Sequence, residues 1–116
     1  NDKKTFNQGK IWLIRLDPTE GSEIKKTRPC LIISRTKINQ KLNTITIIPL
    51  SSGKTDKSIL LINVNQTKQN GLKSDSHLVI PQLRTVAKHR CIKKLGQLEP
   101  KYIPHIKHSF QLHFWG

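Results

Sequence analysis

The segment that decides the fold is residues 21–34, GSEIKKTRPCLIIS, in which a polar, cation-rich loop leads directly into an apolar strand. Residues 31–33, Leu-Ile-Ile, are apolar at successive positions, which is typical of a strand buried on both faces. Pro29 fixes its own φ angle and restricts Arg28 to an extended conformation. The guanidinium of Arg28, a permanent cation with a planar set of donors suited to phosphate, is therefore expected at the mouth of this strand.

The charge of the chain is strongly unbalanced. Lys and Arg number 21 against 7 Asp and Glu, which gives the 116 residues a formal net charge of +14 at pH 7. Such a surface attracts polyanions, so nucleic acid or an acidic protein is the expected partner, with a merely solubilising lysine-rich surface as the alternative. The length suits a single domain over residues 1–116, of which residues 1–8 are expected to be flexible.

Cysteine usage and hydropathy indicate the compartment. Cys30 and Cys91 lie in apolar contexts without CxxC or Cys/His spacing, so buried reduced thiols are expected rather than a disulfide or a zinc site. No apolar run approaches the roughly 18 residues that a membrane span needs, and the N-terminus lacks the core of a signal peptide. We therefore expect a soluble, cytoplasmic protein with no membrane partner.

Short β-branched segments separated by turn residues predict strands. They are expected at residues 9–16, 28–35, 43–50, 59–64 and 77–83. Residues 36–43 are expected to form a polar connection, residues 51–58 a turn, and residues 85–90 one helical turn. Pro49 indicates an edge or an exit from the sheet, and Pro81 indicates a bulge.

The last segment changes period. Ile103, Ile106, Phe110 and Phe114 recur at spacings of three and four, which predicts a helix over residues 100–114 with its prolines in the first turn. Several short strands followed by one helix favour a mainly β fold, a small antiparallel barrel with a C-terminal α-helix.

Neither a nucleotide-binding glycine loop nor a recognisable Ser-His-Asp pattern is present in the sequence. His105 and His108 are spaced to share a metal ion but have no visible third ligand, so we expect neither a metal site nor another cofactor. His77, next to Asp75 and Ser76, could belong to an active site, although its replacement by Ala is expected to leave activity intact.

A basic surface with a few polar groups at strand ends suffices for one reaction. RNA carries its own nucleophile, the 2′-OH, so its cleavage requires neither a metal nor an enzyme nucleophile. The protein has to align the 2′-oxygen with the phosphorus, stabilise the phosphorane, and allow one proton to leave the nucleophile and another to reach the 5′-oxygen. One Arg, one hydroxyl and one carboxylate could provide these functions.

The motifs of the chain, taken in order, resemble those of the MazF/PemK/Kid toxins, mRNA interferases of bacterial toxin–antitoxin pairs. The matching segments cover nearly the whole chain and are residues 9–18 (GKIWLIRLDP), 21–23 (GSE), 26–29 (KTRP), 31–34 (LIIS), 48–52 (IPLSS), 75–76 (DS), 82–86 (QLRTV) and 95–98 (LGQL). The resemblance implies the SH3-like barrel of the CcdB, MazF and Kid toxins, a homodimer, and single-stranded RNA bound in a groove across the dimer interface. It also implies sequence-specific, metal-independent cleavage of mRNA to 2′,3′-cyclic phosphate and 5′-OH ends.

The resemblance further implies the site residues and partners. Arg28 of the RP motif, Ser51 in place of the more common Thr, and Glu23 in place of a helping carboxylate are the expected catalytic residues. The expected RNA-binding residues are Lys25, Lys26, Thr27, Ser52, Lys54, Lys57, Gln82 and Arg84. The cognate antitoxin should have an acidic tail that blocks the basic groove, and promoter DNA should be bound only through that antitoxin.

One departure from the family pattern and several alternatives stay open. Pro81 stands where some members carry an acidic residue proposed as general base, so Glu23, water or the phosphate would have to accept the proton. Arg28 could instead cap the barrel in a salt bridge with Glu23 or Asp75, and Ser51 could be an ordinary turn residue. A CcdB-like gyrase poison without nuclease activity and an inactive RNA-binding module of the same fold are the alternative functions.

Overall fold

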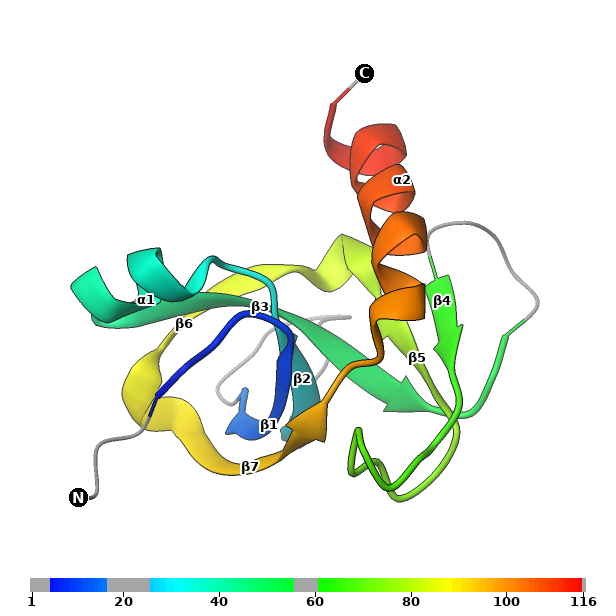
Figure 1. Cartoon of the computed structure of the whole chain (residues 1–116), viewed down its shortest axis with the longest axis horizontal. Helices are drawn as coiled ribbons and strands as arrows, with labels where there is room; N and C mark the ends of the chain where they lie inside the picture. The colour runs from blue at the N-terminus through cyan, green and yellow to red at the C-terminus, as the bar shows by residue number, and fades with distance from the viewer. Residues whose placement is uncertain (1–4, 17–25, 56–60, 116) are drawn as a thin grey trace.

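A strongly curved antiparallel sheet with one long helix at its side forms the protein in the computed structural model, which describes residues 5–16, 26–55 and 61–115 (Figure 1). Its strands are β1 (Lys10–Arg15), β2 (Thr27–Ile32), β3 (Thr44–Ser52), β4 (Leu61–Val64), β5 (Ser76–Val79), β6 (Arg84–Ala87) and β7 (Cys91–Gln97). The helices are α1 (Thr36–Lys41) and α2 (Ile103–Phe114), with short 3-10 turns η1 (Ile80–Gln82), η2 (Lys88–Arg90) and η3 (Pro100–Tyr102).

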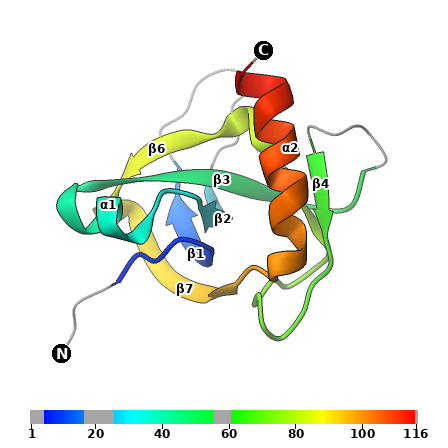
Figure 2. The ribbon, with the colours of Figure 1, turned by 45° about the horizontal axis from the view of Figure 1, so that its top comes forward.

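The strands pair in the order β4-β5-β3-β2-β1-β7, and β6 pairs with β3 off this path. Every pairing within the described residues is antiparallel, and none joins β4 to β7, so the sheet curves without closing. Figure 2 shows β6, β3 and β7 arranged around β1 and β2. The predicted mainly β, antiparallel fold with a C-terminal helix is confirmed.

The long strand β3 joins the two parts of the sheet. It pairs with β2 as far as Cys30↔Pro49 and with β6 over residues 44–47, and then its residues 50–52 pair with β5. The strand thus changes partners at Pro49, where the sequence predicts an edge or an exit. It continues to Ser52, so the prediction that Ser51 begins a turn is wrong.

Two apolar clusters form the core, because successive strand residues point to opposite faces of the sheet. One contains Trp12, Ile14, Leu16, Cys30, Ile32, Ile45, Ile47, Val86 and Cys91. The other includes Ile11, Leu31, Ile48, Leu50, Leu78 and Ile80 together with Tyr102 and Ile106 from the C-terminal segment. Trp12 is therefore a core residue, and both cysteines are reduced and buried as expected.

Three further local predictions are corrected by the structure. Residues 36–41 form α1 instead of a loop, because Asn39 is held by side-chain hydrogen bonds to the Phe6 carbonyl at 2.7 Å and the Ser34 carbonyl at 3.0 Å. The strand expected over residues 77–83 ends at Val79, since Pro81 lies in the turn η1. The helical turn expected over residues 85–90 is confined to the 3-10 turn η2 at Lys88–Arg90, because residues 84–87 pair with β3 and form β6.

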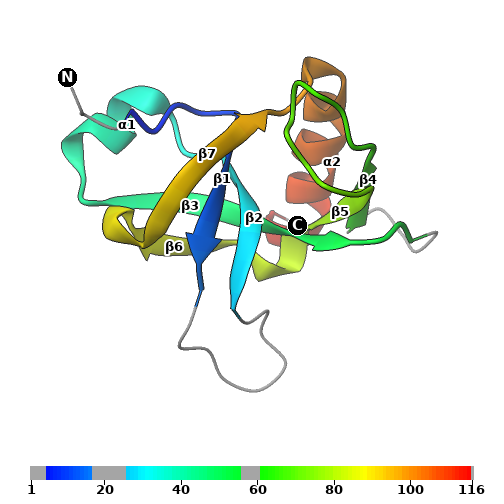
Figure 3. The same cartoon turned by 90° about the horizontal axis from the view of Figure 1, so that it is seen from below.

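The C-terminal helix lies where the sequence places it. η3 and α2 together cover residues 100–114, with prolines in their first turns. Ile106 is buried and Phe110 is half-buried, whereas Ile103 and Phe114 are exposed, so the buried face is narrower than predicted. Figure 3 shows α2 beside β4 and β5, with α1 at the opposite end of β3. Among the described helices, none is long and apolar enough to cross a membrane.

Candidate functional site

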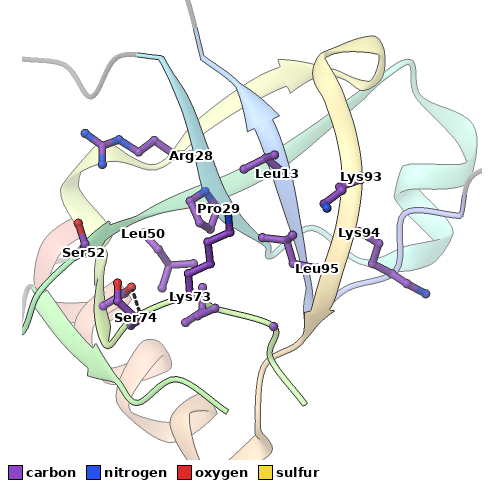
Figure 4. A pocket seen from close by; sticks show the side chains of 13 residues that line it. Leu13, Arg28, Pro29, Leu50, Ser52, Lys73, Ser74, Lys93, Lys94 and Leu95 are labelled. Carbon is purple, nitrogen blue, oxygen red and sulfur yellow. Dashed lines mark hydrogen bonds between the residues drawn. The ribbon is translucent and has the colours of Figure 1, made fainter. Parts of the chain in front are cut away.

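A cavity of about 530 Å³ lies between the start of β2, the end of β3, the segment before β5, and β7 (Figure 4). Its apolar floor consists of Leu13, Pro29, Leu50, Leu72 and Leu95, and its polar rim of Arg28, Ser52, Lys73, Ser74, Ser76, Lys93 and Lys94. No Asp or Glu is among these lining residues. A rim of cations and hydroxyls above an apolar floor suits an anionic ligand that also has apolar faces, as a nucleic acid strand does.

Arg28 stands at one end of this cavity. Its side chain is half-buried, and Figure 4 shows it at the same end as Ser52, with Lys93 and Lys94 at the other. The Nε of Arg28 is buried and has no hydrogen-bond partner among the described residues. A buried donor without a partner is costly, so this guanidinium is suited to an anion that enters the cavity.

The strand register places three polar side chains in one row, which we call the polar row: Arg28, Ser51 and His77. Ser51 of β3 lies directly opposite His77 of β5. β2 and β3 pair as far as Cys30↔Pro49, and Arg28 and Ser51 each lie two residues beyond this pair on their strands. Residues opposite one another in an antiparallel pair share a face of the sheet, so the polar row crosses three neighbouring strands.

The turn after β3 is held by side chains from the next two strands. His77 Nδ1 lies 2.7 Å from the Gly53 carbonyl oxygen. Asn63 of β4, opposite His77, accepts from the Thr55 amide at 2.9 Å and donates to the Thr55 carbonyl at 2.7 Å. Gly53 adopts a positive φ of 91°, which favours glycine at this turn. His77 and Asn63 therefore hold the turn that follows Ser51 of the polar row.

The far wall of the cavity is a segment packed very closely onto β7. Gly71 has a φ of 72°, and a Cβ there would lie 2.0 Å from the Leu95 carbonyl oxygen. A Cβ on Gly96 would lie 2.3 Å from the Gln69 carbonyl oxygen. The Gln97 amide donates to the same Gln69 carbonyl at 2.9 Å. Two glycines thus permit the approach that brings Lys73 to the rim.

The predicted site residues fall into distinct places. Arg28 and Ser52 line the cavity, whereas Ser51 does not line it and belongs to the polar row. Lys26 and Thr27 are exposed at the entrance to β2, and Lys54 forms an ion pair with Asp75 at 3.8 Å.

The remaining candidates lie elsewhere or outside the described chain. Gln82 lies in η1, and Arg84 on β6 donates to the Leu16 carbonyl at 3.5 Å, which points to a supporting role. Glu23, Lys25 and Lys57 lie outside the described residues. Lys73, Lys93 and Lys94 could not be identified from the sequence, because only the fold brings them to the cavity. No group of three or more His, Cys, Asp or Glu that could hold a metal occurs in the described ranges.

Solved structures share this fold. The structure of MazF from Deinococcus radiodurans matches this one with a TM-score of 0.81 at 13% identity, covering 95% of this chain and 96% of that chain. An endoribonuclease solved in complex with its cognate antitoxin from a mycobacterial species matches with a TM-score of 0.72 at 14% identity, covering 91% of each chain. At such identities these matches establish a shared fold.

The sequence gives the family. Residues 7–114 match the model of the PemK-like, MazF-like toxins of type II toxin–antitoxin systems, and the chain belongs to this family. Endoribonuclease MazF9 of Mycobacterium tuberculosis is 26% identical over 115 residues, which are 93% of this chain and 95% of that protein. Endoribonuclease EndoA of Bacillus subtilis is 26% identical over 106 residues, 90% of each protein.

Proposed function

We propose that this toxin is an endoribonuclease that cleaves single-stranded mRNA at specific sequences without a metal ion. The observation that carries the proposal is the guanidinium of Arg28, whose buried Nε lacks a partner among the described residues, at the mouth of a cationic cavity. The endoribonuclease relatives that match nearly the whole chain support the same activity.

The reaction is a transesterification within the RNA. The 2′-oxygen loses its proton and attacks the adjacent phosphorus, and the P–O5′ bond breaks as the 5′-oxygen takes up a proton from water. The products are a 2′,3′-cyclic phosphate and a 5′-OH end. Arg28 stabilises the phosphorane charge with its planar donors, and the Ser51 hydroxyl donates to a non-bridging oxygen of the same phosphate. Glu23 remains a proposed helper, and Lys26, Thr27 and Ser52 contact the neighbouring RNA.

The partners follow from charge and family. A net charge of +14 favours an acidic antitoxin tail that occupies the cationic cavity and competes with RNA. We also propose that the toxin acts in the bacterial cytoplasm as a homodimer, with RNA bound along a groove shared by both copies. Promoter DNA would be bound only through the antitoxin.

Incubation of the purified protein with a long RNA of mixed sequence in EDTA tests the activity. Discrete fragments with 5′-OH and 2′,3′-cyclic phosphate ends, abolished by Arg28→Ala, are expected. A DNA of the same sequence, which lacks the 2′-OH, should remain intact. Intact RNA at a large excess of folded protein would contradict the proposal, and inhibition of DNA gyrase by that same protein would indicate a CcdB-like poison instead.

A further inference from the structure

We propose that His77 is the general base that removes the proton from the 2′-OH, a role that rests on the proposed ribonuclease activity. Two geometric observations carry this proposal: the contact between the imidazole and the Gly53 carbonyl, and the position of His77 in the polar row with Ser51 and Arg28.

The contact with Gly53 fixes the tautomer of the neutral imidazole. A carbonyl oxygen can only accept a hydrogen bond, so at 2.7 Å the Nδ1 of His77 must carry the proton and donate it to Gly53. The neutral ring then presents Nε2 as an unprotonated acceptor. Within the described part of the chain, Nε2 has no hydrogen-bond partner. Histidine held by a carbonyl at one nitrogen and open at the other is well suited to general base catalysis.

The polar row places this acceptor beside the proposed phosphate site. Ser51 is directly opposite His77, and Arg28 lies on the neighbouring strand β2, two residues beyond the pairing of Cys30 with Pro49 of β3. A phosphate that contacts Arg28 and Ser51 therefore has its ribose next to the strand that carries His77. This order, with a cation, a hydroxyl donor and a proton acceptor on three adjacent strands, matches the needs of a 2′-OH attack.

Uncharged residues flank His77 within the sheet. Ser51 from β3 and Asn63 from β4 are the uncharged residues opposite it on its two sides. Lys54 and Asp75, at the neighbouring turn, pair with each other at 3.8 Å, and Arg28 lies two strands away in the polar row. The opposite charges of Lys54 and Asp75 thus offset each other.

The assignment of His77 also provides the general base that Pro81 cannot be. Where some relatives carry an acidic residue, this chain has an exposed proline in η1 that cannot accept a proton. In the proposed step the 2′-oxygen proton passes to His77 Nε2 as the O2′–P bond forms and the P–O5′ bond breaks. The 5′-oxygen takes its proton from water, and the imidazolium then releases its proton to solvent. This assignment reverses the expectation, drawn from sequence alone, that His77→Ala leaves activity intact.

Three variants of the full chain test the role. His77→Asn retains a side-chain N–H that can donate to the Gly53 carbonyl but removes the base, so the turn should be kept while the cleavage rate falls about 100-fold or more. His77→Ala opens a space in which added imidazole can replace the side chain. His108→Asn removes an exposed imidazole from α2 and is the matched control.

Cleavage rates of a long RNA, measured from pH 5 to 8, separate the outcomes. A general base works only in its unprotonated form, so wild-type activity should fall at acid pH, and this fall should vanish in His77→Asn. Imidazole should restore His77→Ala but not Arg28→Ala. If the wild type cleaves RNA and His77→Asn cleaves it at the same rate, the general-base role is overturned while the ribonuclease activity remains. The same conclusion holds if His77→Asn is slow but keeps the wild-type pH profile and imidazole does not rescue His77→Ala. If folded wild type leaves RNA intact, the proposed function itself fails.

Discussion

Ser51 of β3 and His77 of β5 lie directly opposite each other. Their neighbours in the sequence, Leu50 and Leu78, also pair with each other and are buried in the core. Because the buried pair fixes the register, the polar pair cannot slip without exposing leucines. The same core residues therefore stabilise the fold and set the position of the proposed catalytic groups.

Replacement of Arg28 tests charge stabilisation. Arg28→Ala should lower the cleavage rate about 10²- to 10³-fold, the effect expected when one donor to a developing oxyanion is removed. Arg28→Lys keeps the charge but loses the planar pair of donors, so its cleavage rate should lie between those of the wild type and Arg28→Ala. Single-turnover cleavage rates at saturating protein give the comparison, with thermal unfolding as the folding control. An unchanged rate in Arg28→Ala would contradict the assignment.

The two serines at the end of β3 can be separated. Ser51→Ala should slow cleavage roughly 10- to 150-fold, because a hydrogen bond to a charged group contributes about 1.5–3 kcal/mol. Ser51→Thr keeps the hydroxyl and should remain active. Ser52→Ala, in the cavity beside Arg28, should weaken RNA binding with little change in the single-turnover rate. A reversal of these two effects would assign the phosphate contact to Ser52 instead of Ser51.

The glycine contact between β7 and the preceding segment should be intolerant of any side chain. Gly96→Ala places a Cβ 2.3 Å from the Gln69 carbonyl oxygen, and relief of this clash should cost roughly 1–3 kcal/mol of unfolding free energy. Chemical denaturation provides the measurement. Gly53→Ala, where no atom lies within 4 Å of the added Cβ, is the control for backbone strain alone. Equal losses in both variants would argue against the packing explanation.

Glu99 should make the fold sensitive to acid. Burial tends to raise its pKa, but hydrogen bonds from Thr67, its own backbone and Asn70, together with the charge of Lys101, lower the pKa below its usual value. A carboxyl with a lowered folded pKa contributes stability that is present above its unfolded pKa, about 4.3, and is lost as the pH falls through the folded value. The Tm difference between wild type and Glu99→Gln should therefore shrink from pH 7 to pH 3. A constant difference would contradict this.

The two thiols should be inert in the folded protein. Burial, followed by the neighbouring Cys91, raises the pKa of the Cys30 thiol far above its ordinary value, so little thiolate exists at neutral pH. A thiol reagent such as Ellman's should label neither cysteine in native protein and both in guanidinium chloride. Fast labelling of either one under native conditions would show that the core around β1 and β2 opens readily.

Local patterns predicted the strands up to residue 64 and the C-terminal helix, since those segments follow clear periods and are bounded by turn residues. α1 was missed because its six residues have no apolar stripe and depend on the contacts of Asn39 with residues 6 and 34. β6 was missed because a four-residue strand is decided by its partner, here the start of β3, which lies about 40 residues earlier in the sequence.

The site was predictable where local geometry decides it. Arg28 could be placed at a strand mouth because Pro29 restricts the conformations of both residues. The role of His77 could not, since its hydrogen-bond partner Gly53 is 24 residues away and only strand pairing brings them together. Lys93 and Lys94 could not be assigned to the site either, because only the pairing of β7 with β1 distinguishes them from ordinary exposed lysines.

The contact of Gly71 and Gly96 with the neighbouring backbone has a consequence for anyone who wishes to alter what this toxin cuts. Since the two chain segments meet without space for even a methyl group, insertions or loop grafts there would pull the cavity wall away from its support. New specificities are better sought by exchanging outward side chains such as Lys73 and Ser74, which can vary while the main chain beneath them stays as it is.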